Sequence, residues 1–151
     1  MTALAWVLLA AMPWQSGAVV DARDYPRPGE GVAAFTAMER ALVRGFDGIC
    51  GDTFCEGDYS NLRALQLRCA VHQATGAVSA CLWSFAGSYA DIGDGSGPTP
   101  VIEARTWVCQ LPVLPGTPLP VLLDMLSGHD ALDTRLPGRG ISPYEALTEC
   151  F

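Results

Sequence analysis

Four carboxylates between residues 47 and 58 are the side chains of this chain best suited to chemistry. Oxygen ligands on a turning loop suit Ca²⁺, and an acid pair such as Glu56 and Asp58 suits glycoside hydrolysis. The spacing does not match an EF-hand, and short acids commonly cap helices and bond turn amides. We therefore expect a solvated acidic loop that binds neither a metal nor a cofactor, made of Asp47, Asp52, Glu56 and Asp58.

A nucleophile with a matching base is not apparent. There is no G-x-S-x-G element, and neither His72 nor His129 belongs to a recognisable triad or metal motif. His129 follows a helical segment, where its charge would favour the helix dipole. The sequence therefore favours a non-enzymatic protein over an enzyme.

The cysteine pattern predicts disulfides. The chain has six cysteines and no C-x-x-C, and an even number in a small exported chain is typical of a disulfide framework rather than a zinc site. An even count also leaves no spare thiol for nucleophilic catalysis. The cysteines are Cys50, Cys55, Cys69, Cys81, Cys109 and Cys150.

A hairpin between Leu65 and Phe85 gives the first disulfide pair. Apolar and polar residues alternate on both sides of a turn over residues 74–76, with Gly76 in the left-handed position. This turn sets Cys69 directly opposite Cys81. It also sets Leu67 opposite Trp83 and Leu65 opposite Phe85 on the same face. A slip by one residue would separate the sulfurs and mix the faces.

Local spacing predicts a second cysteine pair and leaves the third as the remainder. Cys50 and Cys55 lie five apart in a glycine-rich stretch that can close a small ring. Cys109 and Cys150 are then left to each other, and their bond would fasten the C-terminus onto a strand over residues 101–110.

Three helices complete the expected fold. Apolar spacing predicts a helix over residues 31–46, and Thr117 with Pro118 predicts the start of a second. Ser142 to Glu145 forms a capping box that predicts a third, ending near Cys150. The fold class is α+β: an N-terminal helix, a three-stranded antiparallel meander, and two short C-terminal helices covering it. We expect Trp83 and Trp107 to pack against the cysteines inside this core.

The first 18 residues resemble an export signal. An apolar run from Ala3 to Met12 ends at Pro13, and small residues follow up to a cleavage site after Ala18. Only the α-amino group supplies positive charge before the run, and a buried N-terminal helix is the alternative. The prediction is a signal peptide over 1–18 and a single domain over 19–151, located in the periplasm or secreted. A second long apolar segment is absent, so the mature chain should have no membrane span.

The residues around the first two cysteines carry a family resemblance. The run Gly48-Ile49-Cys50-Gly51-Asp52-Thr53-Phe54-Cys55-Glu56-Gly57-Asp58-Tyr59-Ser60-Asn61-Leu62, with the Cys69/Cys81 hairpin, resembles a group of exported bacterial proteins. The resemblance covers about residue 45 to the C-terminus. It implies export and a disulfide scaffold, and it transfers no catalytic residue.

Charge narrows the choice of partner. Nine basic and sixteen acidic side chains give a net charge of −7, which argues against nucleic-acid binding. The sequence favours an exported binding module, such as an inhibitor or immunity-type protein for a cationic partner such as a basic protein. The alternative is a small exported hydrolase that uses the acidic loop Asp47–Asp58.

Overall fold

The computed structural model describes residues 17–92, 97 and 99–151, so almost all of the predicted signal peptide lies outside the described residues. The helices and strands, in chain order, are β1 (Val19–Asp21), α1 (Val32–Ile49), β2 (Arg63–His72), β3 (Ala77–Asp91), β4 (Val101–Gln110), β5 (Thr117–Pro118), α2 (Leu119–Leu126) and α3 (Pro143–Cys150), with 3-10 turns η1 (Ala22–Asp24) and η2 (Cys50–Asp52). None of the described helices is long and apolar enough to cross a membrane.

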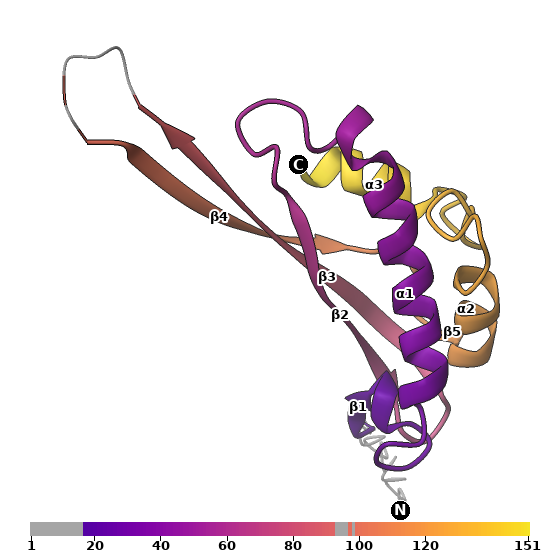
Figure 1. The fold of residues 1–151 in the computed structure, drawn as a ribbon. Coiled ribbons are helices and arrows are strands. Elements are labelled where there is room, and N and C mark those ends of the chain that lie inside the picture. Colours follow the sequence, from indigo (N-terminus) through magenta and orange to yellow (C-terminus); the bar gives the residue numbers. More distant parts are fainter. Residues whose placement is uncertain (1–16, 93–96, 98) are drawn as a thin grey trace, which may run out of the picture.

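The strands form one antiparallel sheet, and the helices lie on one of its faces (Figure 1). The strand order is β1-β2-β3-β4, and β5 pairs with β3. The α+β class and the β2–β3–β4 meander are as the sequence predicts. The prediction missed β1 and β5, because strands of three and two residues are too short to show alternation.

The β2–β3 register matches the prediction at its centre and departs from it at both ends. Beside the turn, a shift between Ala70 and Val71 sets Val71 opposite Val78, whereas the predicted three-residue turn over residues 74–76 would set it opposite Ser79. Cys69 lies opposite Cys81 and Leu67 opposite Trp83. The predicted pairing of Leu65 with Phe85 is wrong, because a bulge between Ala64 and Gln66 brings Ala64 opposite Phe85. A bulge inserts one unpaired residue, and Leu65 is consequently 58% exposed on the other face.

The helix α1 covers the buried face of the sheet. It extends three residues beyond the predicted end at Phe46, and its inward side carries the expected apolar residues Phe35, Met38, Leu42 and Phe46. These side chains share one core with the inward residues of β2 and β3. Burial of this stripe against the sheet supplies most of the helix's stability.

The two C-terminal helices differ in how well their starts were predicted. The N-cap of α2 is Pro118 rather than Thr117, because Thr117 and Pro118 pair with β3 and the Leu119 N–H donates to the Gly76 carbonyl. The start of α3 is as predicted: Ser142 accepts from the Glu145 N–H, and the Glu145 carboxylate accepts from the Ser142 N–H.

A two-stranded arm projects from the body (Figure 1). The predicted second strand stops at Phe85, but β3 continues to Asp91. β2 pairs with β3 only as far as Ala86, so beyond that point β3 is paired with β4 alone. We call the paired residues 87–91 and 101–105 the arm. A two-stranded ribbon buries little apolar surface of its own.

Three disulfides tie these parts together in the predicted pairs. Cys50 bonds Cys55 just after α1, Cys69 bonds Cys81 across β2 and β3, and Cys109 on β4 bonds Cys150 at the end of α3. The last of these fixes the C-terminal helix to the sheet.

We expect the three bonds to differ in their effect on stability. In the chain-entropy treatment, the Cys109–Cys150 bond, with a separation of 41 residues, contributes about 4 kcal/mol, and Cys50–Cys55, with a separation of 5, about 2 kcal/mol. Denaturant unfolding of the Cys109→Ala/Cys150→Ala and Cys50→Ala/Cys55→Ala variants measures this difference. Equal losses, or the reverse order, would contradict the assigned role of the long loop.

Stability should also depend on the α3 capping box at acid pH. The hydrogen bond from the Ser142 N–H, aided by Arg135, lowers the pKa of Glu145 from 4.5. The stabilisation is therefore complete above about pH 4.5 and is lost as the pH falls through the lower folded-state pKa.

The matched variants are Glu145→Gln and Glu149→Gln. Denaturant unfolding between pH 2 and pH 6 should show a shallower acid loss for Glu145→Gln, which keeps the capping oxygen but cannot titrate. Glu149→Gln, on the same helix and exposed, should follow the native chain. Identical slopes for all three proteins would refute the assignment.

Candidate functional site

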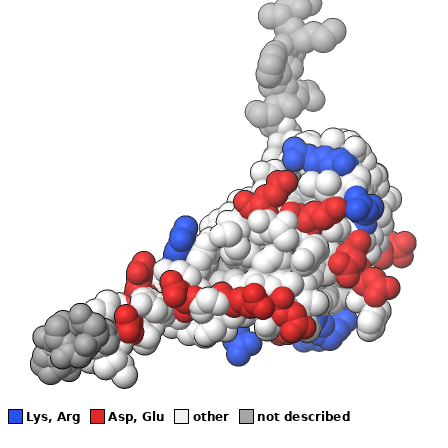
Figure 2. Space-filling view, turned by 90° about the horizontal axis from the view of Figure 1, so that it is seen from above, with Lys and Arg blue, Asp and Glu red and all other residues white. Residues whose placement is uncertain are grey.

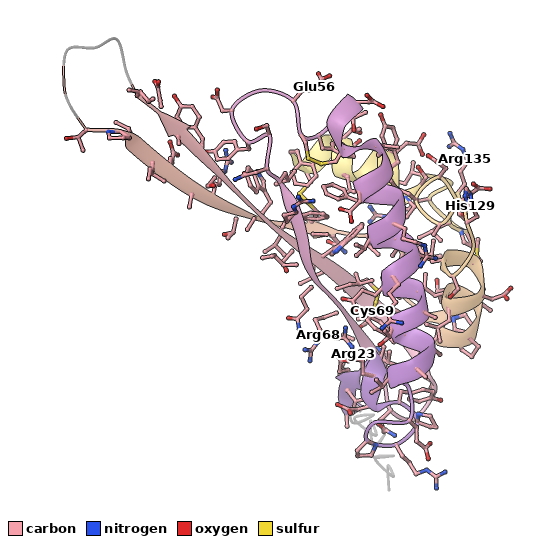
Figure 3. All side chains as sticks on the ribbon, in the orientation of Figure 1. Arg23, Glu56, Arg68, Cys69, His129 and Arg135 are labelled. Atoms are coloured by element: carbon pink, nitrogen blue, oxygen red, sulfur yellow. A yellow bond between two sulfur atoms is a disulfide. The ribbon has the colours of Figure 1, made fainter. Side chains whose placement is uncertain are left out.

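The four predicted acidic residues lie exposed around the end of α1 and the loop that follows it. Asp47 is in the last turn of α1, Asp52 closes η2, and Glu56 and Asp58 precede β2. Figure 3 shows Glu56 pointing away from the body. Within the described ranges, no three His, Cys, Asp or Glu side chains are grouped to hold a metal ion.

These four carboxylates have no hydrogen-bond or ion-pair partner among the described residues, as is also the case for Asp124, Asp133 and Glu149. Elsewhere arginines neutralise several acids at 2.6–2.9 Å, in the pairs Asp21–Arg68, Glu39–Arg23, Glu30–Arg27 and Glu145–Arg135. The acidic loop therefore keeps its full capacity to bind an external cation.

The loop is nevertheless held firmly. The Cys50–Cys55 disulfide closes its first turn, where the Thr53 hydroxyl donates to the Ile49 carbonyl at 2.8 Å. At its far end Asn61 donates to the Ser88 hydroxyl and accepts from the Ser88 N–H, both at 2.7 Å. Gly57, at φ 78°, provides the left-handed residue in between. The carboxylates are thus presented on a fixed frame.

An open aromatic hollow of about 330 Å³ lies beside this loop. Its walls are Phe54 from the loop and Tyr144 and Phe151 from the C-terminal segment, with Thr53 and Thr148 at its margin. The ring of Phe54 lies 5.5 Å from that of Tyr144 and 5.2 Å from that of Phe151, centre to centre. We call this group the aromatic hollow.

Acidic residues flank the aromatic hollow in the chain. Asp52 immediately precedes Thr53, Glu56 lies two residues after Phe54, and Glu149 follows Thr148; all three are exposed. Aromatic faces attract cations, and nearby carboxylates add an ionic contact. The arrangement is therefore suited to an arginine or lysine side chain of another molecule.

Sequence reasoning did not find this hollow. Phe54 stands alone in a loop, and Phe151 lies beyond the last predicted helix, so neither belongs to a periodic pattern. The one available signal was the predicted Cys109–Cys150 bond. It brings the residue after Cys150 to the sheet, where the Phe151 ring lies 5.0 Å from that of Phe85.

A second acidic group lies along the arm, with Glu103 opposite Tyr89 and Asp91 at the paired end farthest from the body. Tyr59 donates to Glu103 at 3.2 Å and Tyr89 to Asp91 at 3.1 Å. Partial burial, and then the Glu103 hydrogen bond, raise the pKa of Tyr59, and the Asp91 hydrogen bond is the main cause of the raised pKa of Tyr89. Asp58 acts in the same direction on both. Figure 2 shows acidic side chains along the arm and across the adjoining body.

His72, His129, Trp83 and Trp107 are not part of the acidic loop and do not line the aromatic hollow, although the Trp107 ring contacts those of Tyr59 and Phe151. His129 is fully exposed beside Asp130 at 2.9 Å, next to a hollow of about 400 Å³ that Arg44 and Asp133 also line. No serine or cysteine lines that hollow. Trp83 is buried against Phe46 and Phe85, and Trp107 is half-buried, so both pack inward.

No protein-family model, curated protein or solved structure matches this chain. The functional inference therefore starts from the positions of the chain's own residues.

The pair of hydrogen bonds between Asn61 and Ser88 should control how firmly the loop is held. We expect Asn61→Ala to cost about 1–2 kcal/mol, because the half-buried Ser88 N–H loses its acceptor. Native-state hydrogen exchange should show faster exchange at the Ser88 amide. Ser60→Ala, one residue earlier and exposed, is the control; an unchanged Ser88 amide in Asn61→Ala would contradict this role.

Proposed function

We propose that this protein is an exported, non-enzymatic binding module, of the inhibitor or immunity type, for a basic protein. The observation that supports this best is the aromatic hollow of Phe54, Tyr144 and Phe151, whose lining residues are close in the chain to the exposed carboxylates of Asp52, Glu56 and Glu149. The three disulfides are compatible with a location outside the cytoplasm.

The chemistry favours a cationic side chain over a neutral one. A guanidinium or ammonium group stacked on an aromatic face gains about 0.5–2 kcal/mol, and a flanking carboxylate adds a charge-assisted hydrogen bond. Arginine fits best, because its planar group can stack on a ring and bind a carboxylate together.

Net charge and rigidity support the same interpretation. A net charge of −7 accelerates encounter with a basic partner. The disulfide at Cys50 and Cys55 and the bond at Cys109 and Cys150 hold both walls of the hollow. Little conformational freedom is then lost on binding, which favours affinity.

A hydrolase using Asp47–Asp58 was the alternative prediction. It requires two carboxylates that face a common substrate. Asp47, Asp52, Glu56 and Asp58 are all exposed to solvent, at the end of α1, in η2 and in the loop before β2, and none of them lines either hollow described above. No observation on the described residues favours this alternative.

The test is capture of a partner from periplasmic extract by the immobilised chain. We expect a basic protein to bind stoichiometrically and to be released at high salt. With that protein purified, Phe54→Ala and Asp52→Asn/Glu56→Gln should each weaken binding at least about tenfold, as expected for an interface anchor.

The matched control is Asp124→Asn/Asp133→Asn. It removes the same charge from exposed sites away from the hollow and should leave affinity almost unchanged. Equal losses in both double variants would show that net charge alone binds the partner. Turnover of a polymer substrate that disappears with Glu56→Gln would replace the proposal with the hydrolase.

A further inference from the structure

The outer edge of β4 has no neighbour in the sheet. β4 pairs with β3 from Val101 to Gln110 and is the last strand on that side. Apart from Trp107 and Cys109, all of its residues are exposed. No backbone hydrogen bond from another described segment reaches this edge, and Figure 1 shows it open along the arm.

The opposite edge of the sheet is protected. β1 pairs with the last three residues of β2. Further along β2, the Leu67 N–H donates to the Glu39 carboxylate at 2.9 Å, and Arg23 holds that carboxylate at 2.7 Å. Short strands and side chains that satisfy an edge are the usual ways to prevent pairing with another chain. The ten-residue edge of β4 has neither.

Exposed apolar side chains accompany this open edge. Val101 is 63% exposed, Ile102 74% and Val108 64%. An exposed edge strand with apolar side chains is a template for pairing with a further strand.

The residue that follows β4 shows which backbone groups of β4 bond to β3 and which point outward. The Leu111 N–H donates to the Cys81 carbonyl at 3.0 Å, one step beyond the Gln110–Leu82 pair. Hydrogen-bonded and non-hydrogen-bonded pairs alternate in an antiparallel ladder. Odd-numbered residues of β4 therefore bond to β3, and the backbone groups that face outward belong to Ile102, Ala104, Thr106, Val108 and Gln110.

We propose that two copies of this chain pair antiparallel through β4, with Ala104 opposite Ala104 of the second copy. Ile102 then lies opposite Thr106 of the second copy, and the outward groups exchange about six backbone hydrogen bonds. On the other face, Glu103 lies opposite Arg105 of the second copy in a non-hydrogen-bonded pair, where side chains approach most closely. The twofold symmetry repeats this ion pair.

The charges of Glu103 and Arg105 favour this register, and they favour a second copy of this chain as the partner strand. A slip that centres the twofold axis on residue 103 sets Glu103 opposite itself, and one that centres it on residue 105 sets Arg105 opposite itself. Like charges directly opposite each other destabilise a sheet. The strand Val101–Gln110 is thus complementary to its own reversed copy, which a strand from an unrelated protein need not be. The edge contains no residue of the aromatic hollow, so this inference stands apart from the proposed function.

The first test is sedimentation velocity on the purified full chain over a range of concentrations. We expect a concentration-dependent dimer. Ala104→Pro should be monomeric, because proline removes an outward N–H that β3 does not use, and an edge strand tolerates proline there. Circular dichroism and thermal unfolding verify that this variant is folded. A native chain that remains monomeric, or a folded Ala104→Pro that still dimerises, would overturn the proposal.

Charge reversal tests the register. Glu103→Arg and Arg105→Glu should each weaken the dimer at least about tenfold, because each sets like charges opposite each other twice. Mixing the two single variants should restore association, since each then offers the other two complementary charges. Asp124→Arg, with a charge change of the same size at an exposed site on α2, should dimerise like the native chain. Failure of the mixed variants to associate would refute the proposed register.

Discussion

The disulfide between Cys69 and Cys81 fixes the register between β2 and β3. These residues are directly opposite each other in the β2–β3 ladder and are buried with Leu67 and Trp83 on the same face. Because side chains alternate across a strand, fixing one pair fixes which residues face the helices and which face solvent. The core under α1 and the exposed face with Leu82 both follow from this pair.

A sheet with helices on only one face has two consequences for how the molecule meets others. At the helical end, disulfides hold the half-buried rings of Phe54 and Tyr144 and the exposed ring of Phe151 near exposed carboxylates in the chain. On the arm, β3 and β4 extend beyond the end of β2. The outer edge of β4 and its apolar side chains are therefore exposed to solvent. Both features, the rigidly held aromatic hollow and the unpaired edge of β4, are consistent with a small core that is stabilised by disulfides.

The parts predictable from sequence were those with a local physical rule. The turn at Gly76 and the alternation around Cys69 defined the hairpin, and Ser142 with Glu145 defined a helix start. The bulge at Leu65 has no local signal in the sequence. The Leu65 side chain is apolar and could lie on either face of the strand. Thr117 and Pro118 obey helix-start rules, but pairing with β3 overrides them. The acidic residues were visible in sequence, whereas the rings beside them meet only through the Cys109–Cys150 bond.

Disulfide mapping of the unreduced protein tests the central claim most directly. Trypsin cleavage after arginine separates the cysteines into peptides 45–63, 69–105, 106–135 and 140–151. The predicted result is an internal cross-link in each of the first two peptides and one bond joining the last two. A bond between peptides 45–63 and 69–105, or alkylated free cysteines before reduction, would contradict the register and the fold that depends on it.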